Sequence, residues 1–369
     1  MKTLFLSLLA TLGEVSASGM LRLADHTDIT PFWNTANSSW SWSLVATNST
    51  YAPGQTYFPV RDLSGQNPFT PRDGDRYLRS ASANFNFIGV AAGGPIWILP
   101  MSDNGQAWPG FGDTQSNTFA SYTETDTRVS GSAPWLRLQL SAVDGPAGGF
   151  FSLYSSSSLV WMRTDNGIDI NDVFIKPFNH AHANWCFTKK GLWRVRMTVS
   201  GFQGPGASNP TPTSAELPIY FAIGAFAEWR ASRFSGPDAV DPAIGGDLAD
   251  PDQDGISNLL EYALGGDPLT SSAVREGDSG VLAPVFGRVI IDSLHYPTFT
   301  YHRRKASTVS EITYATEWQN GLSPSGWVQG GIITNTQSID AFWEKVTLRY
   351  SLPISSTSGL FCRLKITWN

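Results

Sequence analysis

The chain has few cysteines, few charges and no long apolar segment after its first residues. Only two cysteines, Cys186 and Cys362, occur in 369 residues, and they lie far apart, which argues against a scaffold held together by disulfides. Charged residues make up 15% of the chain and the formal net charge is -6, so the composition gives no reason to expect nucleic acid as a partner. No later stretch offers the roughly 20 apolar residues that a transmembrane helix needs. We therefore expect no transmembrane segment in the mature chain.

The N-terminus has the pattern of a secretory signal peptide. Lys2 precedes an apolar run from Leu4 to Leu12, and Val15, Ser16 and Ala17 provide a small-residue cleavage site. This pattern predicts a signal peptide over residues 1–17. The mature protein is then expected to be secreted, periplasmic or at the cell surface.

Glycine, proline and aromatic residues are abundant, which favours β structure over helix. From about residue 21 to 224, short apolar alternations are separated by turns, as in a sandwich-like all-β domain. We place this domain at residues 18–226. Its clearest predicted strands are Asn84–Val90, Pro95–Leu99, Trp135–Leu140, Phe150–Tyr154, Trp193–Val199 and Pro218–Ile223.

A connector over residues 227–270 follows, in which residues 229–246 are expected to be irregular. A short helix is predicted from about Ser257 to Leu264, ended by the Gly265–Gly266 pair. Residues 271–369 then alternate again and predict a small C-terminal β-sandwich. Its expected strands are Val285–Ile291, Thr298–His302, Glu311–Trp318, Trp343–Tyr350 and Phe361–Trp368.

The connector contains the spacing of an EF-hand-type calcium loop. Its side-chain ligands, at loop positions 1, 3, 5, 9 and 12, would be Asp250, Asp252, Asp254, Asn258 and Glu261. Gly255 stands where the loop turns sharply, and Ile256 would contribute its carbonyl oxygen. The alternative is a solvated acidic turn without an ion. Calcium at such an extracellular site binds at about 10⁻⁴ to 10⁻³ M, which suits a structural ion that fixes the angle between the two β domains.

A second candidate site is formed by histidines. His180 and His182 are two of only five in the chain, and on an extended backbone residues i and i+2 share one face. His26 and Asp28 could complete the ligand set, and zinc, copper, manganese or iron would suit it. Asn184 is a candidate for a residue behind the ligands that fixes the tautomer of a histidine ring by a hydrogen bond. The alternative is a pair of ordinary surface histidines.

Several blocks of the first domain, among them His180–Thr188 and His26–Ile29, together resemble the choice-of-anchor M, or surface-anchored repeat, domain of exported bacterial proteins. The resemblance covers roughly residues 20–225, and the chain departs from it with Cys186 in place of alanine and Asp25 in place of glycine. It implies association with metal-type ABC transporters and cell-envelope components. The connector is similar to the Asp-rich calcium module that precedes C-terminal β modules in exported bacterial proteins. The blocks that carry the resemblance are His180–Thr188, His26–Ile29, Phe87–Gly89 through Trp97 to Pro100, Asp144–Pro146 with Gly149–Tyr154, and Asp165–Gly167.

No recognisable catalytic motif occurs. The segment 277–280 resembles the nucleophile segment of chymotrypsin-like proteases but has no matching histidine segment. The sequence therefore predicts an exported, non-enzymatic binding protein that captures or relays a transition-metal ion and carries a structural calcium. Two alternatives remain open: a polysaccharide-binding or polysaccharide-cleaving surface protein, and a purely architectural envelope protein. The 14 tryptophans could form a sugar platform or, more ordinarily, sandwich cores.

Overall fold

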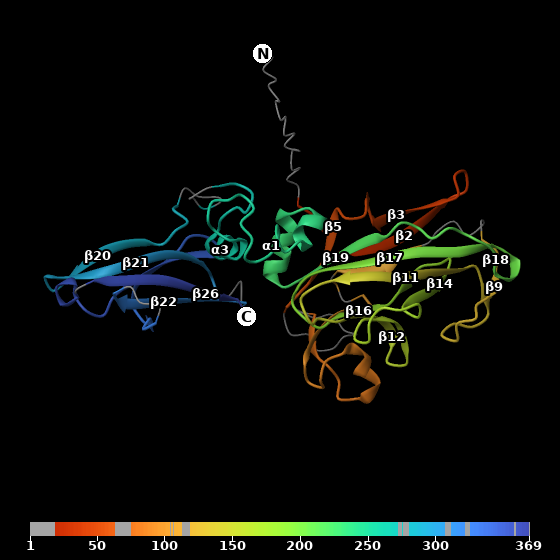
Figure 1. Cartoon of the computed structure of the whole chain (residues 1–369), viewed down its shortest axis with the longest axis horizontal. Coiled ribbons are helices and arrows are strands. Elements are labelled where there is room, and N and C mark those ends of the chain that lie inside the picture. The colour runs from red at the N-terminus through yellow and green to blue at the C-terminus, as the bar shows by residue number, and fades with distance from the viewer. Residues whose placement is uncertain are drawn as a thin grey trace, which may run out of the picture.

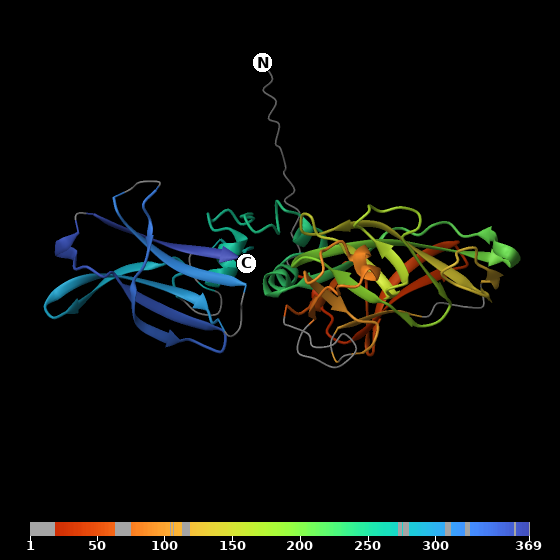
Figure 2. The same ribbon diagram turned by 90° about the horizontal axis from the view of Figure 1, so that it is seen from below.

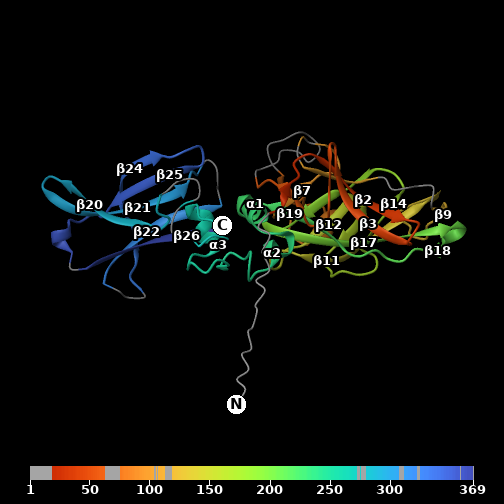
Figure 3. The same cartoon turned by 90° about the horizontal axis from the view of Figure 1, so that it is seen from above.

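The computed structural model describes residues 19–62, 75–103, 105, 107–112, 119–271, 275, 280–306, 311–321, 325–357 and 359–368. The expected signal peptide and residues 277–279 of the protease-like segment lie outside this part of the chain. Strands dominate and the helices are short, which confirms the all-β class. Figure 1 shows two β lobes, with the helices α1 (Ala225–Arg233) and α3 (Asn258–Leu264) between them. Figure 3 shows the same separation from above.

Three main sheets build the N-terminal lobe. The first has the order β1-β5-β19-β17-β11-β14, with β18 paired to β17. Its strands are β1 (Leu21–Arg22), β5 (Thr56–Val60), β11 (Trp135–Asp144), β14 (Val173–Pro177), β17 (Gly191–Gly204), β18 (Ser208–Pro210) and β19 (Leu217–Ile223). A short 3-10 turn, η3 (Pro205–Ala207), joins β17 to β18.

The second sheet has the order β15-β8-β2-β3-β4 and the third the order β13-β12-β16-β7-β6. The strands of the second are β2 (His26–Asn34), β3 (Ser39–Ala46), β4 (Ser49–Tyr51), β8 (Trp108–Phe111) and β15 (Ala181–His182). Those of the third are β6 (Arg76–Leu78), β7 (Pro95–Leu99), β12 (Phe151–Ser156), β13 (Leu159–Arg163) and β16 (Asn184–Phe187). A small hairpin pairs β9 (Tyr122–Thr123) with β10 (Ser132–Ala133).

Aromatic rings from all three sheets meet in one core. Trp185 of the third sheet lies 5.5 Å from the Phe111 ring of the second sheet and 5.0 Å from the Phe221 ring of the first. All three side chains are fully buried. Such rings each bury about 150–250 Å² and contribute much of the hydrophobic stabilisation. Both cysteines are free thiols, so packing rather than a disulfide holds this lobe together.

Two predicted segments have a different structure. Asn84–Val90 was expected as a strand, but Ala83–Ile88 forms a 3-10 helix, η1. Its ends explain the difference, because the Ser82 side chain accepts a hydrogen bond from the Asn84 N–H and Gly89 closes the turn with φ +84°. Residues 229–246 were expected to be irregular, yet they contain most of α1 and the short helix α2 (Gly236–Val240).

The C-terminal lobe packs two sheets against each other. The first has the order β20-β21-β25-β24 and the second the order β23-β22-β26. Phe299 of the first and Trp318 of the second meet in the core, with ring centroids 6.2 Å apart. The predicted strands of this region are confirmed to within a few residues, and Val285–Ile291 has the predicted bounds. The elements are β20 (Val285–Ile291), β21 (Leu294–Arg304), β22 (Ile312–Asn320), β23 (Val328–Gln329), β24 (Ile332–Ser338), β25 (Trp343–Arg349), η4 (Ile354–Ser356) and β26 (Leu360–Trp368).

The C-terminal lobe holds the end of helix α3. Carbonyl groups in the last turn of a helix have no hydrogen-bond partner within the helix. Three side chains of the C-terminal lobe donate hydrogen bonds to these carbonyl groups of α3. Arg304 Nε donates to the Tyr262 oxygen at 2.7 Å and Tyr314 Oη to the Ala263 oxygen at 2.7 Å. Arg275 Nε donates to the Leu264 oxygen at 3.1 Å. The connector helix is therefore fixed to the second lobe.

The buried Glu311 carboxylate joins helix α3 and the C-terminal lobe to the first lobe. Its Oε1 accepts a hydrogen bond from the Phe226 N–H at the start of α1 and another from Tyr262 Oη at 3.3 Å. Burial raises the pKa of Glu311. None of the helices among the described residues is long and apolar enough to cross a membrane.

Candidate metal centre

Three strands of the second sheet bring the histidine site together. In register, Asp28 of β2 and His182 of β15 both lie opposite Gly110 of β8, and His26 lies opposite Trp108. Side chains alternate across a sheet, so these residues occupy the face opposite the core.

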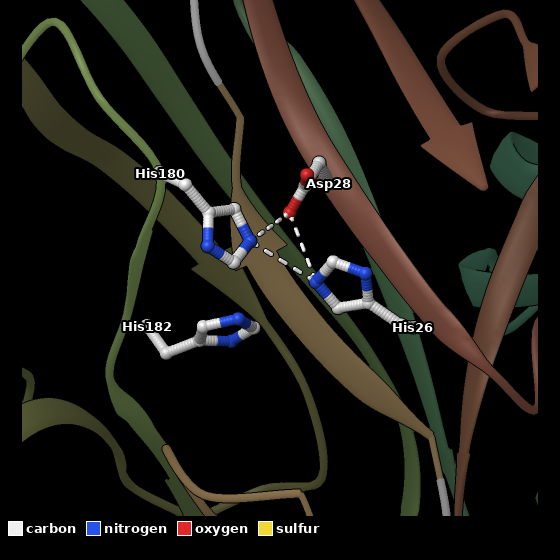
Figure 4. A group of neighbouring side chains, drawn as sticks. All are labelled: His26, Asp28, His180 and His182. Carbon is white, nitrogen blue, oxygen red and sulfur yellow. Dashed lines mark hydrogen bonds and ion pairs between the residues drawn. The ribbon is translucent and has the colours of Figure 1, made fainter. Parts of the chain in front are cut away.

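The imidazoles and the carboxylate converge on one point, as Figure 4 shows. His180 Nε2 lies 3.1 Å from His26 Nε2 and 3.0 Å from Asp28 Oδ1. His26 Nε2 lies 3.3 Å from the same carboxylate oxygen. One ligand atom from each of these residues and from His182 falls within 4.8 Å of all the others. Imidazole nitrogens bonded to one ion at about 2.0–2.1 Å lie roughly 3–4 Å apart. The Nε2 atoms of His26 and His180 have this separation.

His182 is the most constrained member of the cluster. Its ring stacks on Trp108, with centroids 4.0 Å apart and planes 8° apart. Its Nδ1 lies 3.3 Å from the Pro109 carbonyl oxygen, which can only accept, so Nδ1 carries the proton and Nε2 keeps its lone pair. That Nε2 is buried without a hydrogen-bond partner. Burial, followed by the neighbouring His180, lowers the pKa of His182 to about 4. The His182 ring is therefore neutral, and its Nε2 lone pair can bind a metal ion.

Gly110 leaves open the space between these ligands. A Cβ atom at this position would lie 2.4 Å from Asp28 Oδ1, 2.8 Å from His182 Cε1 and 3.2 Å from His180 Nε2. A side chain there would displace the ligands or fill the space between them. The backbone of β8 thus passes directly beside the four candidate ligands.

Asn184, which was expected to fix a histidine tautomer, makes its hydrogen bonds to other residues. Its side-chain oxygen accepts a hydrogen bond from the Met101 N–H at 3.0 Å, and its amide donates to the Tyr154 oxygen at 3.1 Å. The residue begins β16 in the third sheet, where it links strands. The Pro109 carbonyl and the Trp108 ring, which the sequence did not single out, position His182 instead.

The acidic connector forms a second, separate cluster. Oxygens of Asp250, Asp252 and Asp254 lie within 4.8 Å of one another. Backbone groups orient them, since Asp254 N donates to Asp250 Oδ1 at 3.2 Å and Gly255 N to Asp250 Oδ2 at 2.9 Å. Ile256 N donates to Asp254 Oδ1 at 2.8 Å. Gly255 has φ +89°, as the sharp turn of the predicted loop requires.

Asn258 and Glu261 lie in the helix after this loop, and both are buried. The Asn258 amide donates to the Ile244 and Gly246 oxygens, while its own Oδ1 has no partner. Glu261 Oε2 is also buried without a partner. Burial, then the negative charges of Asp252 and Asp254, raise the pKa of Glu261 to about 8. Orphaned oxygens beside three carboxylates fit a cation that prefers oxygen ligands.

Compared with known protein families and with curated proteins, the chain gives no match. The resemblance to the choice-of-anchor M domain accordingly stays a prediction that rests on the residues quoted for it.

Proposed function

We propose that the N-terminal lobe captures a divalent transition-metal ion outside the cell, and that calcium orders the connector. The observation that carries the proposal is the convergence of three imidazole nitrogens and one carboxylate oxygen within 4.8 Å. Imidazole suits zinc, copper and iron, and the added carboxylate also suits manganese. Calcium prefers oxygen ligands throughout, so it belongs to the connector rather than here.

The number of protein ligands favours a site that binds a metal ion over a site that catalyses a reaction at the ion. Catalytic zinc sites usually have three protein ligands and leave one position for water, whereas a tetrahedral site with four protein ligands is closed. His26, His180, His182 and Asp28 supply four donors.

Exposure of the ligands favours uptake and release. The side chains of His180, His26 and Asp28 are 42%, 34% and 20% exposed, so solvent reaches the cluster from their side. His182 Nε2 is buried at the opposite side. An ion could enter through the exposed ligands and be held by the rigid one. Together with the expected signal peptide, this supports relay to a metal transporter at the cell surface.

Titration calorimetry on the purified full chain tests the proposal with zinc, copper, manganese and iron ions in turn. We expect one ion of at least one of these metals per chain. The His180→Ala/His182→Ala double variant should lose at least about 100-fold in affinity, because even indirect ligand support is worth 10–100-fold. His295→Ala, an exposed histidine of the C-terminal lobe, is the matched control and should bind like the wild type. The proposal is wrong if none of the four metals binds or if the double variant binds equally well.

A further inference from the structure

The outer face of the third sheet carries a pocket that is unrelated to either cation cluster. Along β7, Trp97 and Leu99 point into the main core, whereas Ile96 and Ile98 point outward. The outward residues form a separate apolar cluster with Ile88 and Tyr154. Figure 2 shows the segment containing η1 in orange across the face seen from below, and its residues Phe85 and Ile88 line a pocket beside this cluster. The pocket has a volume of about 330 Å³.

The segment over the pocket is fixed at both ends. The Arg79 side chain, only 5% exposed, donates from Nε to the Phe85 oxygen at 3.3 Å and from Nη2 to Asn86 Oδ1. At the other end, the backbone of Gly89 approaches Phe150 so closely that a Cβ would lie 2.6 Å from its Cδ2. These contacts hold the backbone of η1 in place, so this wall of the pocket does not depend on a ligand.

The lining defines the chemistry of a ligand. Three rings and four aliphatic side chains line most of the pocket, together with four serines and one asparagine, and no charged residue is among them. An ionised ligand group would therefore lose its hydration without gaining a partner. The pocket volume is near the lower end of the roughly 300–1,000 Å³ typical of small-molecule sites. The rings are those of Tyr77, Phe85 and Tyr154, the aliphatic residues are Leu78, Ile88, Ile96 and Ile98, and the polar ones are Ser80, Ser155, Ser156, Ser157 and Asn184.

We propose that this pocket binds a small neutral molecule that carries an apolar ring, with a polar end at the serines. The aromatic walls would contact the ring, and the serine hydroxyls would donate to or accept from the polar end. Burial raises the pKa of Tyr154 well above its ordinary value, so its hydroxyl also keeps its proton. The pocket lies on the third sheet and the histidine cluster on the second, so the proposal does not depend on metal binding.

Fluorescence titration of the full chain with N-phenyl-1-naphthylamine, a neutral aromatic probe, tests this proposal. We expect saturable binding at one site. Ser80→Trp and Ser156→Trp should each fill the pocket and weaken probe binding at least about tenfold. Ser158→Trp is the matched control. The Ser158 hydroxyl oxygen lies 3.2 Å from that of Ser156, but only Ser156 lines the pocket.

Two results would overturn the proposal: no saturable binding by the wild type, or wild-type affinity in both pocket variants. Circular dichroism shows whether each variant is folded. If one filling variant fails to fold, the other still tests the pocket, because Ser80 and Ser156 belong to different segments. Loss of binding in the Ser158→Trp control as well would place the probe outside the pocket and equally count against the proposal.

Discussion

The two candidate cation sites differ in how far apart along the chain their ligands lie. All ligands of the acidic loop fall between residues 250 and 261, and backbone hydrogen bonds such as Gly255 N to Asp250 Oδ2 close the loop locally. In the histidine site, His26 and His180 are 154 positions apart. Their nitrogens meet only when β2, β8 and β15 pair. One site is thus a property of a short segment, and the other is a property of the folded lobe.

The sites also differ in what the ligands do to each other without an ion. Carboxylates in the loop repel one another, and the raised pKa of Glu261 shows that its ionised form costs free energy in this environment. The neutral ring of His182 instead stacks on Trp108 and is held by the Pro109 carbonyl. We therefore expect the loop to need its ion for stability, and the histidine site to be preformed.

The largest expected effect tests whether the histidine site is preformed around Gly110. Gly110→Ala should lower transition-metal affinity by at least about 100-fold, because its Cβ would lie 2.4 Å from Asp28 Oδ1 and displace a ligand. Titration calorimetry measures the change with the metal that the wild type binds. Gly330→Ala is the control, since its Cβ would meet nothing within 4 Å. Unchanged affinity in Gly110→Ala would mean that the ion does not occupy this space.

Calcium removal should have the next largest effect, this time on stability. At a calcium concentration about 100 times Kd, binding stabilises the fold by about 2.7 kcal/mol. Chelation should then lower the melting temperature by roughly 5–10 °C. Asp252→Ala should abolish this difference in differential scanning calorimetry. Asp241→Ala, an exposed carboxylate of the same connector outside the loop, should keep it. Equal melting curves of the wild type with and without chelator would contradict a calcium site.

All but one of the strands named from the sequence are present, because apolar alternation is a local property. Pro95–Leu99 and Val285–Ile291 have the expected bounds. The alternation failed at residues 84–90, where apolar residues at every second position look like a strand. There the Ser82 cap and the left-handed Gly89 decide in favour of a 3-10 helix. Which strands pair, including the parallel pair β2 and β8, does not follow from alternation.

The same limit explains the site predictions. The acidic loop was recognisable because its candidate ligands fall within twelve consecutive residues, 250–261. The contact of His26 with His180 depends instead on strand pairing. Trp108 and Gly110 were missed because neither has metal-binding chemistry of its own. Asn184 bonds to Met101 and Tyr154 rather than to the histidines, because β15 ends at His182 and β16 begins at Asn184 in another sheet. Residues that are close in the sequence, such as His182 and Asn184, therefore lie in different sheets.

The smallest expected effect tests whether the order of the loop extends beyond its own residues. Tyr262 follows Glu261 directly in α3, and its hydroxyl donates to Glu311 at 3.3 Å. Tyr262→Phe removes this hydrogen bond, which should cost about 1 kcal/mol and lower the melting temperature by roughly 2–4 °C. Tyr296→Phe, a half-buried tyrosine away from the junction, is the control. The calcium-dependent rise in melting temperature should be the same in Tyr262→Phe as in the wild type, because the variant keeps every proposed ligand. A reduced rise would instead mean that the connection to the second lobe helps to form the calcium site, which would then be less local than its sequence indicates.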